Sequence, residues 1–107
     1  MRKLKTTNKF NKELKKAIRR GWDKEKLKSL IHQIERGEPP LPLNADEHPL
    51  IGNYKDRIEC KLKGDQLLIY YIHDAEGNPV PFADIYQDIN KQTVVLERIG
   101  THSDLFR

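Results

Sequence analysis

The most apolar run in the sequence, residues 66–72 (QLLIYYI), constrains the fold more than any other feature. A short continuous apolar segment bounded by turn residues is typical of a strand buried on both faces. Gly64 and Asp65 supply the turn before it, and residues 57–62 alternate polar and apolar side chains, as in a strand with one wet face. Residues 93–99 form another apolar segment. We therefore expect three strands, with residues 66–72 as the central one.

The N-terminal third predicts a short strand at residues 3–6 followed by two helices. Apolar side chains recur at helical spacing after a cap at Thr7 or Asn8, and Gly21 supplies a stop. Asp23 then caps a second apolar stripe, which ends before two adjacent prolines. The apolar positions are Phe10, Leu14, Ala17 and Ile18 in the first helix and Leu27, Leu30, Ile31 and Ile34 in the second.

These elements define an α+β fold in which an N-terminal helical hairpin packs on an antiparallel sheet of about four strands. The length fits a single domain over residues 1–107. Residues 38–53 are loop-like and rich in proline. Residues 73–92 form a long polar excursion between two strands, in which residues 82–86 are expected to add a strand at the sheet edge.

Charge divides the chain into two unequal parts. Residues 1–37 contain 13 Lys and Arg against 4 Asp and Glu, whereas residues 38–107 contain 7 against 12. This asymmetry allows one face of the fold to attract polyanions such as nucleic acid. The alternative is a pair of solvated, lysine-rich helices with no ligand.

Composition excludes several classes of protein. No apolar run approaches the roughly 20 residues needed to cross a bilayer, and the basic N-terminus lacks the apolar region of a secretory signal. Cys60 is the only cysteine, which excludes an internal disulfide and a cysteine-rich zinc site. We expect a cytoplasmic protein without a metal or other cofactor.

Two of the four histidines lie at the margin of the predicted sheet, at His48 and His102. Glu59 and Lys61 share one face of their strand, because strand side chains alternate, and are expected to face solvent. Arg98 could join them from the last strand. These residues could make a cross-strand charge pair of small energetic value. They could also form a concave anion site with acid and base groups at its rim.

The second interpretation suits one reaction in particular. Cleavage of RNA without metal needs a base for the ribose 2′-hydroxyl, positive charge for the transition state and an acid for the 5′-oxygen. Histidine transfers protons near neutral pH, and Lys and Arg supply charge. The sequence contains no phosphate-binding glycine loop or nucleophilic serine elbow.

Several motifs together resemble a known family. The helical hairpin is followed by PPLPL, DEHPLIGNYKD, IECKLKGDQLLIYYI and ERIGTHSDLF. This order is similar to the YafQ-type branch of the RelE/ParE toxin superfamily, the toxins of bacterial type II toxin–antitoxin modules. The resemblance covers almost the whole chain except residues 73–92, which look like an insertion relative to the family. It implies a ribosome-dependent mRNA endoribonuclease that leaves a 2′,3′-cyclic phosphate.

The resemblance also implies roles for individual residues. It places His102 as general acid, and His48 with Asp65 as base or as a group that positions substrate. Arg98 falls on the family's arginine, Phe106 on its terminal aromatic residue and Glu59 on its acidic residue before cysteine. Lys61 stands where the family has a histidine, and we assign it to stabilising the scissile phosphate.

The resemblance further implies two kinds of partner. One is a cognate antitoxin; the other is mRNA with the ribosomal RNA of the A site, gripped by basic side chains of the first helix, Lys15, Lys16, Arg19 and Arg20. Two other classes stay open: a ParE-like toxin that inhibits a topoisomerase, and an inactive toxin-derived binding module. The paired imidazoles argue against a pure inhibitor.

Overall fold

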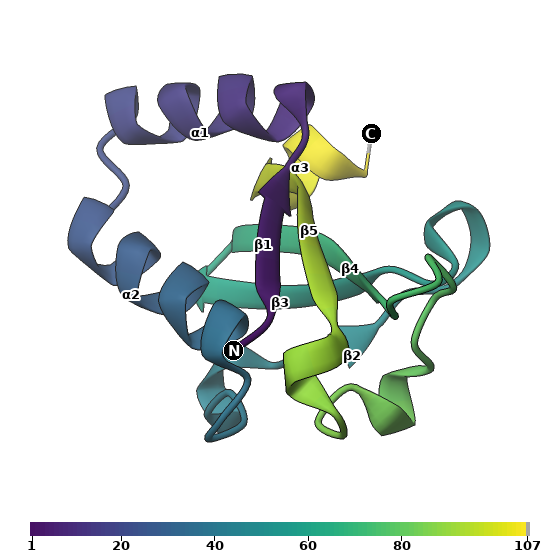
Figure 1. The fold of residues 1–107 in the computed structure, drawn as a ribbon. Helices are drawn as coiled ribbons and strands as arrows, with labels where there is room; N and C mark the ends of the chain where they lie inside the picture. Colours follow the sequence, from purple (N-terminus) through teal and green to yellow (C-terminus); the bar gives the residue numbers. More distant parts are fainter. Residues whose placement is uncertain (107) are drawn as a thin grey trace.

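The structure is a computed structural model and describes residues 1–106. Its five strands form one sheet in the order β1-β5-β4-β3-β2 (Figure 1). The strands are β1 (Lys3–Thr6), β2 (His48–Pro49), β3 (Ile58–Lys63), β4 (Gln66–His73) and β5 (Thr93–Thr101). Neighbours are antiparallel except β1 and β5, which run parallel. The apolar run of the sequence is β4, at the centre of the sheet, as predicted.

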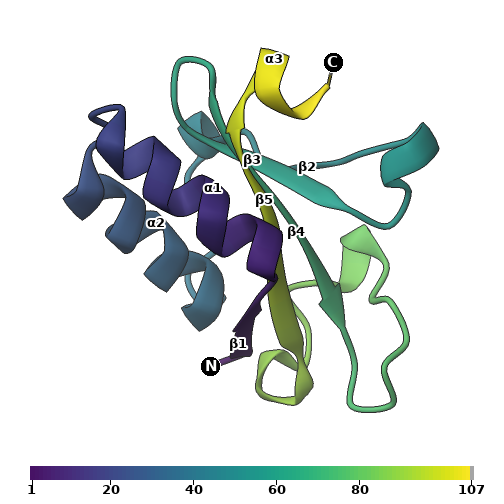
Figure 2. The ribbon, with the colours of Figure 1, turned by 90° about the horizontal axis from the view of Figure 1, so that it is seen from above.

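The predicted helical hairpin is confirmed by α1 (Asn8–Arg19) and α2 (Lys24–Arg36), which lie side by side against the sheet (Figure 2). The side chain of Thr7 caps α1 by accepting a hydrogen bond from the amide of Phe10, at 3.0 Å. Asp23 caps α2 in the same way. Gly37 ends α2 with a φ of 71°, a left-handed conformation that glycine adopts without strain.

The main hydrophobic core fills the space between this hairpin and the sheet. It joins Phe10, Leu27 and Ile34 of the helices to alternate strand residues such as Cys60 and Tyr70. The strand residues between these alternate positions point to the opposite face of the sheet. That face therefore carries the polar side chains predicted to form the site.

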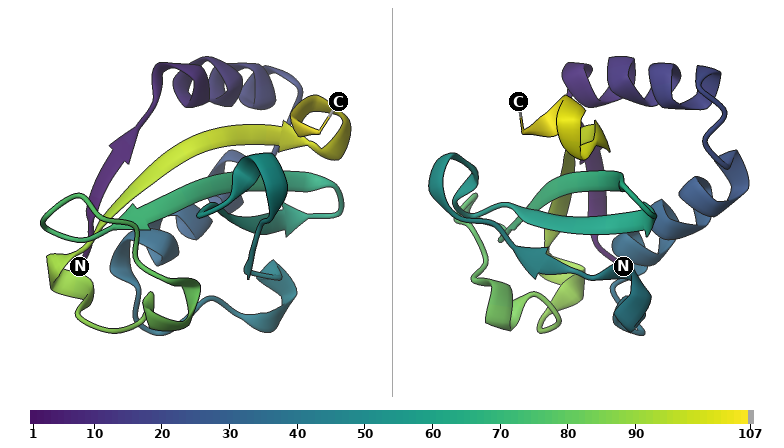
Figure 3. Two further views of the ribbon diagram at one scale, coloured as in Figure 1. Left: turned by 90° about the vertical axis from the view of Figure 1, so that its right-hand side faces the viewer. Right: turned by 180° about the vertical axis from the view of Figure 1, so that it is seen from behind.

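A smaller apolar cluster lies on that opposite face. Leu67 and Ile69 of β4 are covered by Leu105 of α3 (His102–Leu105), which follows β5 directly. Tyr54 and Phe106 pack around them. Figure 3 shows β5 running along the sheet and delivering α3 to its end. The second cluster therefore fixes the C-terminal segment on the face away from the hairpin.

The excursion between β4 and β5 differs from the prediction. Residues 82–86 do not form a strand: the chain makes a 3₁₀ helix at Phe82–Asp84 and another at Ile89–Lys91. Pro81, which lacks an amide hydrogen, precedes the first of them. The carbonyl of Ile85 accepts a hydrogen bond from the buried Arg2 side chain instead of a strand partner. That residues 73–92 are an insertion stays a prediction.

The loop after α2 also contains more structure than expected. It includes 3₁₀ helices at Leu43–Ala45 and Gly52–Tyr54, and the two-residue strand β2 adds an edge to the sheet. Sequence patterns cannot reveal so short a strand. No helix within residues 1–106 has both the length and the apolar character needed to cross a membrane.

Candidate active site

One row of residues crosses the sheet on the face away from the hairpin. His48 of β2 pairs with Glu59 of β3, Glu59 with Ile69 of β4, and Ile69 with Arg98 of β5. Side chains directly opposite each other in neighbouring strands share a face. The sheet therefore brings together polar side chains that are 50 positions apart in the sequence.

His48 and Glu59 form the most direct contact in this row. The Nε2 atom of His48 lies 3.3 Å from Oε1 of Glu59, and its Nδ1 atom lies 2.6 Å from the carbonyl oxygen of Asp46. A carbonyl only accepts hydrogen bonds, so Nδ1 carries the hydrogen. The other ring nitrogen, Nε2, faces the Glu59 carboxylate.

Glu59 is buried, with 8% of its surface exposed, which corrects the expectation that it faces solvent. Its Oε2 atom has no hydrogen-bond partner among the described residues. Burial raises the pKa of the Glu59 carboxyl, and the positive charges of His48 and His102 oppose that rise. Both imidazoles therefore lie within electrostatic range of one carboxylate.

His102 is exposed and is the first residue of α3. Two sets of hydrogen bonds hold the start of this short helix. Thr101 and Asp104 form a reciprocal capping box. The backbone amide of His102 donates a hydrogen bond to Oδ1 of Asp65 at 3.1 Å. Its ring lies 4.9 Å from that of Phe106, centroid to centroid. Asp65 thus lies beside His102, while the resemblance grouped it with His48.

Arg98 is held by side chains of α1 and of the loop before β3. Its guanidinium makes an ion pair of 2.8 Å with Glu13 of α1 and donates to the hydroxyl of Tyr54 at 3.2 Å. The side chain is only 14% exposed, and the hydrogen bonds to Glu13 raise its pKa. In this conformation Arg98 ties α1 to β5, and a direct role on phosphate stays a prediction.

Lys61 lies further along β3, next to an irregularity in the pairing with β4. It borders a pocket of about 230 Å³ shared with α2 and the loop after it. Within residues 1–106 its ammonium makes no hydrogen bond or ion pair. The charge assigned to Lys61 is therefore not neutralised by a neighbouring carboxylate.

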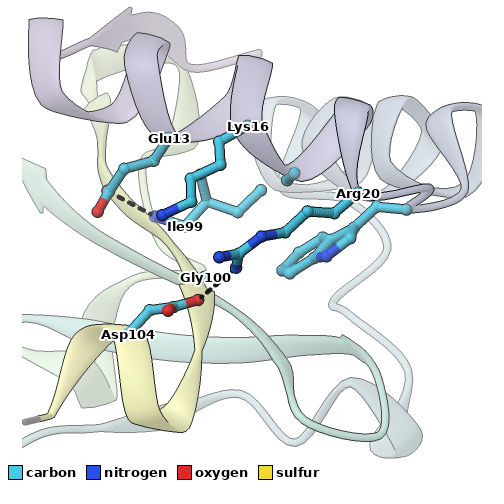
Figure 4. A pocket seen from close by; sticks show the side chains of 8 residues that line it. Glu13, Lys16, Arg20, Ile99, Gly100 and Asp104 are labelled. Carbon is cyan, nitrogen blue, oxygen red and sulfur yellow. Dashed lines mark hydrogen bonds and ion pairs between the residues drawn. The ribbon is translucent and has the colours of Figure 1, made fainter.

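The four basic residues predicted to contact RNA, Lys15, Lys16, Arg19 and Arg20, are all exposed. Lys16 and Arg20 border a pocket of about 240 Å³ between α1 and the C-terminal segment, shown in Figure 4. There Arg20 makes an ion pair of 3.3 Å with Asp104 of α3. One end of the basic helix is thus linked to the helix that begins with His102.

Sequence reasoning missed three residues that shape this site. Glu13 binds both the Arg98 side chain and the backbone amide of Ile99, and its signal was an acidic residue in an otherwise basic helix. Tyr54 binds Arg98 and packs edge to face on Phe106 at 5.5 Å. Asp46 orients His48 through its backbone, which no side-chain motif can reveal.

Comparison with known proteins gives consistent matches over the whole chain. A family model described as the bacterial toxin of type II toxin–antitoxin system, YafQ, matches residues 2–107. The mRNA interferase toxin YafQ of Escherichia coli (strain K12) is 29% identical over 105 residues, covering 98% of this chain and 96% of that protein.

Solved structures of related toxins also match this chain over almost its whole length. The E. coli DinJ-YafQ complex gives a TM-score of 0.75 at 27% identity and covers 100% of both chains. A metal-bound toxin from Helicobacter pylori gives a TM-score of 0.76 at 35% identity and covers 99% of this chain and 100% of that one. The α+β fold expected from the resemblance is therefore confirmed.

The fold and the matches to known proteins together define the class of this protein. It is a bacterial toxin of a type II toxin–antitoxin system. Within that class, the chain belongs to the YafQ family. The resemblance drawn from the sequence motifs is confirmed. The roles assigned to individual site residues stay predictions.

Proposed function

We propose that this protein is an mRNA interferase, an endoribonuclease that cuts mRNA on the ribosome and so arrests translation. Its relatives in E. coli carry the name mRNA interferase toxin. The observation that carries the proposal is the contact of His48 with the Glu59 carboxylate, at 3.3 Å, with His102 near enough for its charge to act on the same carboxylate. Two imidazoles beside one anion site suit proton transfer to and from a ribose phosphate.

The proposed reaction begins with attack of the ribose 2′-oxygen on the adjacent phosphorus. His48 takes the 2′-hydroxyl proton or positions the ribose, and His102, whose backbone amide is held by Asp65, protonates the 5′-oxygen as it leaves. Lys61 and Arg98 stabilise charge on the phosphate, and Glu59 stabilises the protonated form of His48. The products are a 2′,3′-cyclic phosphate and a 5′-hydroxyl end, and no metal takes part.

For Arg98 to bind the phosphate directly, its side chain would have to change conformation. Its ion pair with Glu13 would have to loosen, or its charge would act on the phosphate from a distance. Phe106, whose ring lies 4.9 Å from that of His102, would stack on a base near the cut. Lys15, Lys16, Arg19 and Arg20 would contact ribosomal RNA.

The proposal includes a cytoplasmic location and a cognate antitoxin. E. coli YafQ forms a complex with DinJ. For this chain we propose a protein that covers the basic helix α1 or the His48–His102 face and keeps RNA out. A partner rich in acidic side chains would match the charge of residues 1–37.

A translation reaction with purified components, followed by primer extension, tests this function. Addition of the protein should produce discrete cuts in translated mRNA, ends bearing a cyclic phosphate and no loss of cutting in EDTA. Inhibition of DNA supercoiling without cuts would favour a ParE-like toxin. Absence of both effects, together with harmless expression in cells, would leave only a binding module.

A further inference from the structure

A half-buried polar cluster lies behind the site, on the hairpin side of the sheet. The Glu47 carboxylate accepts hydrogen bonds from the hydroxyls of Tyr70 and Tyr86. Tyr70 is fully buried in β4. Burial raises the pKa of both tyrosines and the Glu47 charge adds to it, so the hydroxyls keep their protons and donate. The Glu47 carboxylate is half-buried and accepts hydrogen bonds from two hydroxyls, so this cluster restrains its position.

Tyr86 comes from the excursion between β4 and β5, and its hydroxyl makes a second contact. It also accepts a hydrogen bond from the backbone amide of Leu41 at 3.4 Å. One hydroxyl therefore holds both ends of the 41–47 segment, which leads directly into β2. Tyr86 thereby connects the excursion to the strand that carries His48.

Arg2 fixes Tyr86 from the other side. Its side chain is 2% exposed and donates hydrogen bonds to the carbonyls of Ile85 and Ile34 and to Gln92. Its guanidinium lies 5.5 Å from the centre of the Tyr86 ring. Because the backbone next to Tyr86 is anchored in this way, the hydroxyl has a defined position from which to hold Glu47.

Glu47 and His48 are neighbours at the start of β2, and their side chains take opposite directions. Glu47 reaches Tyr70 on the hairpin side, whereas His48 reaches Glu59 on the other. In extended chain, fixing one side chain on one face directs the next to the opposite face. The strand itself has only two residues and lies at the sheet edge, so it restrains His48 weakly.

We propose that Glu47, held by Tyr70 and Tyr86, is a positioning residue for His48, and that residues 73–92 contribute to catalysis through Tyr86. The activity side of this inference rests on the proposed function. Its structural side, the control of the His48 ring by a tyrosine on the far face of the sheet, does not.

The first test measures single-turnover cleavage by Tyr86→Phe, which removes one hydroxyl and leaves the ring. A misplacement of about 1 Å can cost up to about a hundredfold in rate, so we expect cleavage about tenfold slower at saturating ribosomes. The matched control is Tyr71→Phe in β4, whose ring instead packs on Arg57 at 4.2 Å; its rate should change less than twofold.

A double-mutant cycle separates positioning from loss of stability. If Tyr86 acts through His48, Tyr86→Phe should slow His48→Ala no further. The same tenfold loss in the His48→Ala background would overturn the proposal. Thermal melts of each variant establish that the rates belong to folded protein, and Glu47→Gln provides a second variant expected to change the rate in the same direction.

The second test uses no activity. In protein labelled with ¹⁵N-histidine, Tyr86→Phe should shift the imidazole signals of His48 and leave those of His32 and His102 in place. Tyr71→Phe should shift none of the three. An unmoved His48 signal would overturn the inference even if cleavage fell. A wild-type protein that cuts no RNA would refute the proposed function while these spectra still decide the positioning role.

Discussion

His48 and Glu59 face each other across β2 and β3, with Nε2 of the imidazole 3.3 Å from Oε1 of the carboxylate. The carboxylate is buried and the imidazole is partly exposed. A buried acid beside an accessible base is an arrangement typical of catalytic sites. The contacts of its two ring nitrogens give the His48 side chain a fixed direction.

The first prediction concerns Glu59 and pH. Burial raises its pKa above the ordinary value of 4.5, so between 4.5 and the folded-state pKa the folded protein binds more protons than the unfolded chain. The free energy of unfolding should therefore fall as pH rises through that window. Glu59→Gln cannot ionise and should lack this fall. Urea unfolding at several pH values measures it; parallel curves for the two proteins would contradict the burial argument.

The second prediction concerns the ion pair between Arg98 and Glu13. Arg98→Ala leaves a mostly buried carboxylate without its partner and should lower the free energy of unfolding by about 3 kcal/mol. The control is Arg20→Ala, which breaks the pair with Asp104, whose side chains are 48% and 32% exposed, and should cost at most about 1 kcal/mol. Equal decreases for the two variants, measured by denaturant unfolding, would show that Arg98 does not tie α1 to β5.

The third prediction concerns Phe106, which packs on Tyr54 and lies beside His102. Phe106→Ala should lower stability by about 1 kcal/mol, because the edge-to-face packing of its ring on Tyr54 disappears. If the ring also stacks on a base, worth about 1–3 kcal/mol, the KM for programmed ribosomes should rise between about fivefold and a hundredfold. A variant that unfolds instead would identify Phe106 as a core anchor.

The fourth prediction concerns the exposed cations of α1. Lys15→Gln with Arg19→Gln should weaken binding to ribosomal RNA and reduce the slope of log affinity against log salt by about 0.7–0.9 for each phosphate that the variant no longer neutralises. Lys24→Gln with Lys28→Gln on α2 removes the same charge elsewhere and should change the slope less. Equal changes would mean that net charge, and not the α1 surface, governs binding.

Much of the fold could be predicted from the sequence, because the residues that determine each helix or strand lie within or next to that segment. The caps at Thr7 and Asp23, the left-handed Gly37 and the apolar run of β4 each determine their own segment. Strand β2 has no such signal, since it exists only because its two residues pair with Glu59 and Ile58. Residues 82–86 have strand-like composition, but Arg2, far away in sequence, binds the backbone carbonyl of Ile85.

The site could be predicted only in part, because its contacts also join residues that lie far apart in the sequence. Motifs pointed to His48, Glu59, Asp65 and His102, and the structure pairs His48 with Glu59 across β2 and β3 and places Asp65 against the backbone of His102. Which group pairs with which depends on three-dimensional contacts: Arg98 turns to Glu13, and Asp65 holds the backbone of His102. Glu47 and Tyr86, 39 positions apart, share a hydrogen bond that no spacing could indicate.

The most direct test of the account is single-turnover mRNA cleavage on programmed ribosomes by the wild type, His48→Ala and His102→Ala. Loss of a general acid or base typically slows a reaction by about 10²–10⁴-fold. We predict decreases of that size for His102→Ala and, to a similar or smaller extent, for His48→Ala, with ribosome binding unchanged. Cleavage by His102→Ala at the wild-type rate would contradict the proposed active site.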